Sequence, residues 1–446
     1  MRFVFGLGLF TIFMSLGCNG GGGGGGKSNS PSSTTPASTT PPPVGTTPVV
    51  PLPPAGNAPG NFTVGPSLVK PRGLHTATLL SDGRVLIVGG LDAAAGNPAF
   101  VTENEVYDPT ANTFTLTSSL GGSPGGYMTS SATNKPVPRY LHTATLLADG
   151  RVLICGGYGV ESMDAGGNPV QSDLASAFTF SPTTNTFAAV GNMGMPREAP
   201  AAVLLPGGQV AVMGGLVASL NNNQGGTTAA AEIFDPTANT FSPIGNMLND
   251  RQAPGVLAGG QALVVGGLSL SVPAGQTQVQ SFLVPGSDAL STSTGMFAQG
   301  PSPAIDRIGH SLNVIGADVI MAGGSGQSGD VLQVERLTNG TWTTVAQLSG
   351  PRESHGADSS GTRVLLAGGV FYDSTGTTMT TLATADLFDG SANTVKPLKL
   401  AHQRNGCAVT ALATSHFLVT GGYENGKTDP LGLDGTSVAP TEISNP

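Results

Sequence analysis

The sequence predicts an all-β protein made of repeated four-stranded antiparallel sheets, and three observations carry this prediction. Glycine and proline account for 67 and 34 of the 446 residues, and these two residues favour helix interiors least. A short apolar pattern returns seven times along the chain and ends each time in Gly-Gly. Each copy divides into short apolar runs separated by turn residues, which is typical of strands.

The N-terminus carries an export signal. Arg2 precedes an apolar stretch at 3–14, and small residues lead up to Cys18. The segment resembles a bacterial lipoprotein signal, although Ser15 stands where that family usually has Leu. The resemblance implies that residues 1–17 are removed and that Cys18 is lipidated. An ordinary secretory signal with an incidental cysteine is the alternative.

Residues 18–60 are predicted to be the lipidated cysteine followed by a disordered linker. An unbroken glycine run at 20–26 gives way to a segment rich in Ser, Thr and Pro. Such a composition buries too little apolar surface to offset the entropy of an ordered chain. The folded domain is therefore expected to span residues 61–446.

Each repeat begins at a recurrent arginine. Residues 72–90 read RGLHTATLLSDGRVLIVGG, and residues 139–157 read RYLHTATLLADGRVLICGG. Weaker copies begin at Arg197, Arg251, Arg307, Arg352 and Arg404. The arginines are separated by between 45 residues (Arg307 to Arg352) and 67 residues (Arg72 to Arg139), a period typical of one supersecondary unit per repeat.

Each copy is predicted to contain four strands. In the first copy an apolar run at 75–80 is followed by Asp-Gly at 82–83, which favours a tight hairpin turn, and by a second apolar run at 85–88. A third run ends in a turn at 105–112. The fourth begins with an aromatic residue that we expect to pack between neighbouring sheets. This position holds Phe114, Phe187, Phe241, Phe297 and Trp342, with Val395 as the exception.

The last copy lacks a fourth strand. Its third strand at 441–444 is followed only by two residues, whereas residues 61–72 read like a fourth-strand segment that no other strands precede. We expect the N-terminal strand to complete the last sheet and to cover edges that would otherwise be free. The expected architecture then has seven sheets in a closed ring.

These features resemble the kelch-repeat superfamily over residues 61–446. The resemblance rests on the Gly-Gly after four apolar residues, the Tyr/Phe-Asp-Pro turn, the aromatic fourth strand and the Arg-x-x-His start. It implies a seven-bladed β-propeller with four antiparallel strands per blade. Kelch propellers include protein-binding modules, carbohydrate-acting enzymes such as galactose oxidase and a sialic-acid mutarotase, so the fold alone does not select a function.

The repeated polar residues are interpreted as scaffold. Groups that recur in nearly every copy meet the same local need, such as bonding the carbonyls of a neighbouring blade, and one histidine per blade does not gather metal ligands. Asp108, Asp235 and Asp389 are expected to cap turns, and Cys155 and Cys407 to be small core residues. The histidines three positions after the arginine are His75, His142, His310 and His355.

Ligand binding is expected where the copies differ. The long, polar connections between second and third strands share one rim of the ring, and loops on a rigid scaffold concentrate binding residues. Aromatic rings there would stack on a sugar or a peptide, and covering the hydrophobic rim is the alternative. The candidate ligand-binding residues are Tyr158, Phe371, Tyr372, Tyr423, Asp92 and Glu424.

No catalytic residue, metal ligand or cofactor is predicted. The galactose oxidase pattern needs copper held by His and Tyr, with one Tyr cross-linked to a Cys, and no matching ligand set accompanies Cys155 and Tyr158. A mutarotase would need charged groups in its pocket, and no motif selects them. Calcium at 429–437 is a further alternative, but the spacing does not match an EF-hand loop.

Charge limits the partners. Charged residues make up 10% of the chain, the net charge is -9, and no basic run occurs, so a nucleic-acid partner is excluded. The sequence predicts a monomeric kelch propeller anchored through Cys18 in the bacterial cell envelope, as an outer-membrane lipoprotein that faces the periplasm or the cell surface. It would bind an envelope protein or a glycan without catalysis. A galactose-oxidase-like or mutarotase-like enzyme acting on glycans is the alternative.

Overall fold

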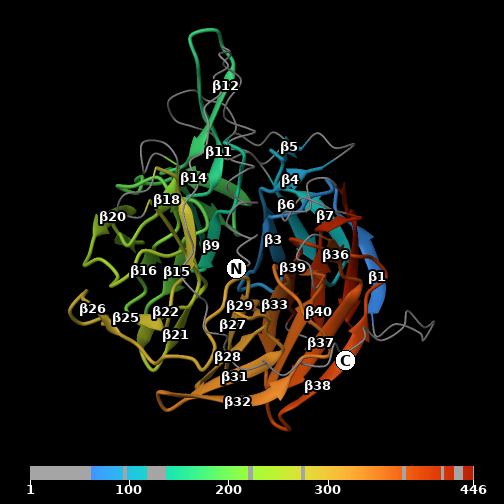
Figure 1. Cartoon of the computed structure of the whole chain (residues 1–446). Coiled ribbons are helices and arrows are strands. Elements are labelled where there is room, and N and C mark those ends of the chain that lie inside the picture. Colours follow the sequence, from blue (N-terminus) through green and yellow to red (C-terminus); the bar gives the residue numbers. More distant parts are fainter. Residues whose placement is uncertain are drawn as a thin grey trace, which may run out of the picture.

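The computed structural model describes residues 62–93, 98–117, 137–218, 225–272, 277–373, 378–412, 416–425 and 435–444. Every regular element in these ranges is a β-strand, so the prediction of an all-β fold is confirmed (Figure 1). The signal, Cys18, the linker and most of the calcium candidate at 429–437 lie outside the described residues.

Seven sheets in the described ranges have four antiparallel strands each. Six of them follow chain order from one repeat. Three sheets consist of β2 (Thr76–Leu79), β3 (Val85–Val88), β6 (Glu105–Asp108) and β7 (Thr113–Leu116); β9 (Thr143–Leu146), β10 (Val152–Cys155), β13 (Ala177–Ser181) and β14 (Thr186–Ala189); and β15 (Ala201–Leu204), β16 (Val210–Met213), β19 (Ala231–Asp235) and β20 (Thr240–Pro243). Three more consist of β21 (Gly255–Ala258), β22 (Gln261–Val265), β25 (Ser287–Leu290) and β26 (Phe297–Gln299); β27 (Ser311–Ile315), β28 (Asp318–Ala322), β31 (Gln333–Thr338) and β32 (Thr341–Gln347); and β33 (Gly356–Ser360), β34 (Arg363–Ala367), β37 (Thr384–Asp389) and β38 (Thr394–Lys399).

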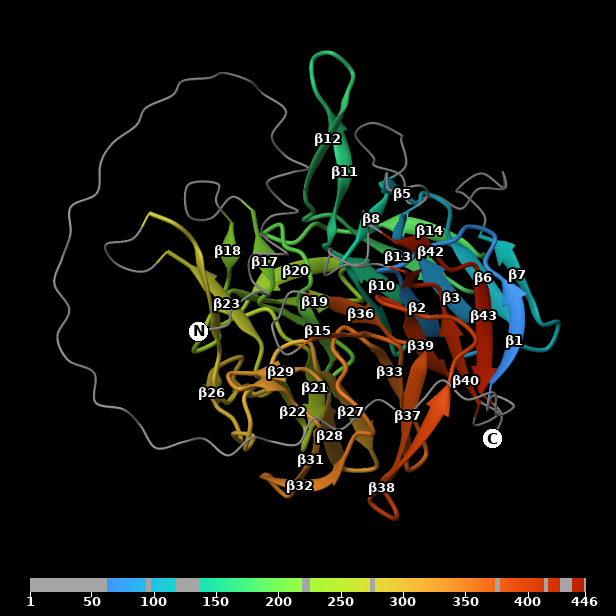
Figure 2. The same cartoon turned by 45° about the vertical axis from the view of Figure 1, so that its right-hand side comes forward.

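The remaining four-stranded sheet joins the two ends of the described chain. It consists of β39 (Ala408–Ala411), β40 (Phe417–Thr420) and β43 (Pro440–Ser444), with β1 (Phe62–Ser67) paired to β43. Phe62 lies opposite Ser444 in this antiparallel pair, and Leu68 continues it by donating its N–H to Ala439 at 2.9 Å. The blue and red strands lie side by side in both views (Figures 1 and 2), as expected for closure by the N-terminal strand.

The first strands contact one another in a circle. β2 contacts β9, and the contacts continue through β15, β21, β27 and β33 to β39, which contacts β2 again. A second circle is made by the backbone: the second glycine of each Gly-Gly donates its N–H to the carbonyl of the next repeat's arginine. These bonds run from Gly90 to Arg139, Gly157 to Arg197, Gly215 to Arg251, Gly267 to Arg307, Gly324 to Arg352, Gly369 to Arg404 and Gly422 to Arg72. The repeats are thus joined to one another and back to the first.

The apolar core lies between neighbouring sheets. The second strands are fully buried because they are apolar along both faces, as β3 and β10 show. One cluster joins Leu86 and Val88 of the first repeat to Phe178 and Phe187 of the second. Trp342 lies in the equivalent cluster between the fourth and fifth repeats. The prediction that the fourth-strand aromatics pack between sheets is confirmed at these positions.

Turn chemistry ends the strands as predicted. The Asp108 carboxylate accepts the N–H groups of Thr110 and Ala111 at 2.8 and 3.1 Å, and Asn112 adopts a left-handed φ of 53° that closes the turn. The Asp235 and Asp389 carboxylates accept equivalent bonds. The predicted capping role of these three aspartates is confirmed.

The connections between second and third strands form short ribbons rather than irregular loops. The first residue after Gly-Gly pairs with the residue that follows the arginine, as Leu91 does with Gly73, which starts each ribbon. The longest ribbon projects away from the sheets (Figures 1 and 2). The ribbon strands are β4 (Leu91–Asp92) and β5 (Ala99–Phe100); β8 (Arg139–Tyr140), β11 (Tyr158–Met163) and β12 (Pro169–Asp173); β17 (Leu216–Val217) and β18 (Gly226–Thr227); β23 (Leu268–Ser271) and β24 (Gln280–Leu283); β29 (Ser325–Gly326) and β30 (Gly329–Asp330); β35 (Val370–Tyr372) and β36 (Met379–Thr381); and β41 (Tyr423–Glu424) and β42 (Thr436–Ser437).

Candidate functional site

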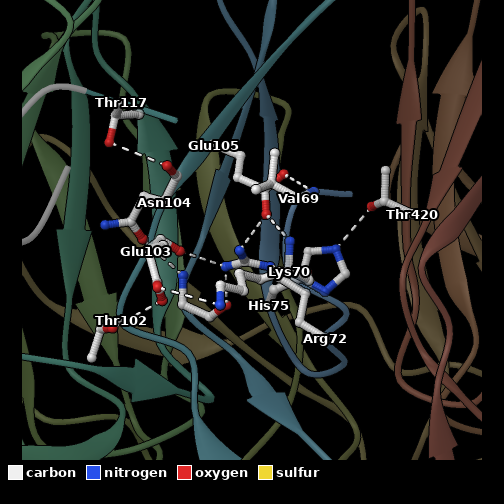
Figure 3. Close-up of polar contacts among 11 residues, drawn as sticks. Val69, Lys70, Arg72, His75, Thr102, Glu103, Asn104, Glu105, Thr117 and Thr420 are labelled. Atoms are coloured by element: carbon white, nitrogen blue, oxygen red, sulfur yellow. Dashed lines mark hydrogen bonds and ion pairs between the residues drawn. The ribbon is translucent and has the colours of Figure 1, made fainter. Parts of the chain in front are cut away.

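The recurrent arginines are buried inside their own repeats. Arg72 donates from Nη1 to the carbonyls of Gly89 and Glu103 at 2.9 and 2.8 Å, and from Nη2 to Glu105 at 2.5 Å. Figure 3 shows the guanidinium surrounded by these acceptors. All seven arginines are at most 1% exposed, so their guanidinium groups face the interior and not the rim.

Six of the seven arginines have a carboxylate partner on the third strand. The same carboxylates also accept N–H groups from the segment that leads into the arginine, as Glu105 does from Val69 and Lys70 at 2.8 and 3.0 Å. Each ion pair therefore fixes the start of its sheet. The pairs are Arg72–Glu105, Arg197–Glu232, Arg251–Asp288, Arg307–Glu335, Arg352–Asp386 and Arg404–Glu442. These acids were not predicted from the sequence, although a Glu or Asp near the start of six of the seven third strands marks them.

The second repeat is the exception. Phe178 occupies the position of the carboxylate, since it lies opposite Ile154 as Glu105 lies opposite Ile87. The guanidinium of Arg139 stacks over the Phe178 ring at 5.1 Å, and its Nη1 donates to the carbonyls of Gly156 and Ser176. Burial without a paired carboxylate lowers the pKa of Arg139 to about 10, which leaves it charged at neutral pH.

Three of the four recurrent histidines join neighbouring sheets through hydrogen bonds. His75 Nε2 hydrogen bonds with Thr420 Oγ1 of the preceding sheet at 2.8 Å, as Figure 3 shows, and His142 and His355 bond with hydroxyls in the same way. The partners are hydroxyl groups and not the carbonyls that the sequence analysis expected. Burial lowers the pKa of His75 to about 3, so the ring stays neutral. The scaffold interpretation agrees with these contacts.

The six candidate ligand-binding residues lie on the ribbons but differ in exposure. Tyr158 and Tyr423 are 5% and 0% exposed and pack in one cluster with Leu91 and Tyr140. Tyr423 Oη donates to the Leu91 carbonyl at 2.9 Å. These two rings therefore lie beneath the rim, with little surface for stacking on a ligand. Tyr158 belongs to the second repeat and Tyr423 to the seventh, and Leu91 of the first repeat lies in the same cluster.

The other four candidates are partly exposed. Phe371 and Tyr372 lie on β35 of the sixth repeat, apart from Asp92 on β4 and Glu424 on β41. Glu424 Oε2 lies 3.4 Å from His402 Nδ1. The structure thus distributes the candidates around the rim and does not bring all six together, and their role in binding stays a prediction.

A second set of residues meets where one repeat joins the next. The residue after the arginine faces the last residue of the preceding ribbon, and at the first such junction the Phe100 and Tyr140 rings lie 5.8 Å apart. At the next junction the corresponding residues are Asp173 and Glu198, and burial followed by the charge of Asp173 raises the pKa of Glu198. The sequence analysis missed this pair because its two members lie 25 residues apart, in different repeats.

Cys155 and Cys407 are buried free thiols, and burial raises the pKa of both. Among the described residues, no group of three or more His, Cys, Asp or Glu side chains is placed to hold a metal ion. The same ranges contain no helix with the length and apolar character needed to cross a membrane.

Comparison with known proteins adds no family assignment. No protein-family model matches the chain, and no curated protein matches it at a significant level.

Proposed function

We propose that this chain is an exported, seven-bladed kelch-type β-propeller that binds a protein or a glycan at the bacterial cell envelope without catalysis. The Arg-x-x-His starts, the Gly-Gly motifs and the circle of backbone bonds back to Arg72 support the propeller. The signal-like segment that ends at Cys18 supports export and a lipid anchor in the outer membrane.

The difference between the two rims carries the proposal of a binding surface. One rim has short turns capped by their own aspartates, such as Asp108. The other presents ribbons of unequal length and sequence, and the longest, β11 and β12, exposes most side chains from Ser162 to Ser172. Rigid scaffolds with variable, exposed segments are typical of recognition modules. The arginines and histidines are engaged within the fold, which leaves the ribbons to recognise a partner.

A binding assay tests this proposal. The full chain, a variant with residues 162–170 replaced by a two-residue Asn-Gly turn, and a Tyr372→Ala variant would be applied to a glycan array and to detergent-extracted envelope proteins. We expect the wild type to capture a defined glycan or protein, and the ribbon variants to lose at least tenfold in affinity, as truncation of an anchoring contact does. Arg84→Ala, on the opposite rim, is the matched control. Binding that survives both ribbon variants but is lost with Arg84→Ala would contradict the assignment of the rim.

The anchor is tested separately. Cys18→Ala is expected to move the protein from the membrane fraction to the soluble fraction, because the acyl chains supply the membrane affinity. Cys155→Ala, which removes a buried thiol, should leave the protein in the membrane fraction. Membrane association of the Cys18→Ala protein would refute anchoring through this residue.

A further inference from the structure

The junction between the second and third repeats brings together a buried carboxyl group, that of Glu198, and a partly exposed one, that of Asp173. Glu198 follows Arg197 and is 0% exposed, and Asp173 ends the projecting ribbon of the preceding repeat. Both oxygens of Glu198 and Oδ1 of Asp173 accept no hydrogen bond from a donor among the described residues. Asp173 Oδ2 accepts the Ala218 N–H, which ties the ribbon to the third repeat.

Two ionised carboxylates have only acceptor oxygens, so they cannot hydrogen bond to each other. An ionised Glu198 would be a buried charge beside a second negative charge, with no donor among the described residues for either of its oxygens, and such a charge is costly. A single proton changes this arrangement, because a carboxylic acid donates an O–H to the neighbouring carboxylate.

We propose that Glu198 and Asp173 share one proton at neutral pH, and that this proton holds the projecting ribbon against the third repeat and releases it when lost. The shared proton makes the attachment of the projecting ribbon sensitive to alkaline pH. This proposal rests on the side chains of the junction and does not depend on any ligand.

The other titratable groups at the junction do not supply a positive charge that would compensate the two carboxylates. Tyr158 lies opposite Asp173 on the ribbon, and burial, followed by the charges of Glu198 and Asp173, raises its pKa to about 12. Arg197 directs its guanidinium to Glu232. Burial is the first cause that raises the pKa of Glu198, and Asp173 is the second; burial also raises the pKa of Asp173.

The junction between the fifth and sixth repeats provides an internal comparison. Glu353 is 1% exposed and follows Arg352, and Asp330 ends the preceding ribbon, opposite Ser325. Here the aspartate is exposed to solvent. Burial and the charge of Asp330 raise the pKa of Glu353 to about 8, so this junction should lose its proton near pH 8.

The direction of the pH effect follows from linkage. A carboxyl whose pKa is higher in the folded state gives full stabilisation below its unfolded pKa, and this stabilisation is lost as pH rises through the folded value. Between about pH 7 and 9 unfolded carboxyls and histidines have already lost their protons. A folding equilibrium constant that still decreases between about pH 7 and 9 therefore indicates that the folded state holds protons which the unfolded state has lost.

The experiment compares the wild-type chain with Glu198→Gln and Asp173→Asn between about pH 7 and 9. Urea unfolding gives the folding equilibrium constant, and amide hydrogen exchange gives the protection of the Ala218 N–H. We expect the wild-type constant to fall about tenfold per pH unit more steeply than that of Glu198→Gln, which removes the shared proton. The difference from Asp173→Asn should be smaller, because burial still favours a protonated Glu198 in that variant. A Gln amide donates to Asp173 without titrating, and Gln252 already occupies the equivalent position in the fourth repeat.

Glu161→Gln, on the same ribbon, is the matched control and should keep the wild-type slope. Glu353→Gln should remove a step centred near pH 8 instead. Equal slopes in the wild type and both junction variants would overturn the proposal. A wild-type slope that disappears when Ca²⁺ is added, and returns with a chelator, would overturn it in favour of a cation between the carboxyls.

Discussion

The arginines of the second and third repeats allow a matched test of what their ion pairs contribute. Arg197 and Arg139 occupy the same position and donate to equivalent carbonyls. Arg197 Nη1 bonds Gly214 and Ala230 at 3.0 and 2.7 Å, and Arg139 Nη1 makes the corresponding two bonds at 2.9 Å. They differ in the partner of Nη2, which is the Glu232 carboxylate at 2.8 Å for Arg197 and the Ser176 hydroxyl at 2.9 Å for Arg139. Arg139 also stacks over the Phe178 ring.

Replacement of each arginine by leucine should therefore have unequal effects. Arg139→Leu removes hydrogen bonds and a stacked ring but leaves no buried charge, so we expect a loss of about 1 to 3 kcal/mol in the free energy of unfolding. Arg197→Leu leaves the Glu232 carboxylate, 6% exposed, without its cation. Breaking a buried pair in this way costs about 3 to 5 kcal/mol. The expected difference between the variants is about 2 kcal/mol.

Urea unfolding of the full chain, followed by circular dichroism and by tryptophan fluorescence, measures both values. The double variant Arg197→Leu/Glu232→Leu should recover part of the loss, because the unpaired charge is gone. The reasoning is refuted if Arg139→Leu destabilises the protein as much as Arg197→Leu. It is refuted equally if the double variant is no more stable than Arg197→Leu.

Three further predictions concern closure, the rim and acid stability. A chain that begins after β1 and Leu68 should lose about 3 kcal/mol or more of stability, whereas removal of residues 20–60 should leave the melting temperature unchanged; equal melting of the two truncations would contradict closure. Tyr423→Ala should lower the free energy of unfolding by about 3 to 5 kcal/mol, because its ring is fully buried. Tyr372→Ala should lower it by only about 1 kcal/mol, and denaturation of both variants measures the difference. Stability should fall as pH drops below 6.5, because His75 gains a proton in the unfolded chain there but stays neutral in the fold down to about pH 3. The decline should be smaller in His75→Gln, and melting temperatures measured across this acid range would show it.

The repeated sheets could be predicted from sequence because each strand is bounded by local signals. The Asp-Gly pair at 82–83, the apolar run 85–88 and the glycines after it specify two strands without reference to the rest of the chain. Closure was predictable because residues 61–72 match other fourth-strand segments. The pairing of β1 with β43 agrees with that prediction.

The sequence left two interpretations of the rim tyrosines open, stacking on a ligand or covering the hydrophobic rim, and a comparison of the repeats separates them for Tyr423. Tyr423 is the first residue after Gly-Gly, and the same position holds Leu91, Leu216, Leu268 and Val370 in other repeats. A position that is apolar in most copies belongs to the interior, and this comparison between repeats favours a core residue over a stacking platform. The interpretation of a ring that covers the hydrophobic rim was the better one for Tyr423.

The ribbons and the junction pairs could not be predicted because no local signal encodes them. Ribbon strands such as β29 are two residues long and contain Ser and Gly, which have low strand propensity. They form because the residue after the arginine supplies a partner across the sheet end, as Ile308 does for Ser325. The carboxyl pair requires two residues that meet only once neighbouring repeats are in place.

The backbone explains why the junction side chains are free to differ. The second glycine of one repeat bonds the arginine carbonyl of the next at every junction, from Gly90 to Gly422, and this bond needs no particular side chain beside it. The neighbouring position can therefore hold two rings at Phe100 and Tyr140 or two carboxyls at Asp173 and Glu198 without opening the circle. Because the constant bonds carry closure, loss of the proposed shared proton at Asp173 and Glu198 is expected to alter the ribbon there without opening the circle.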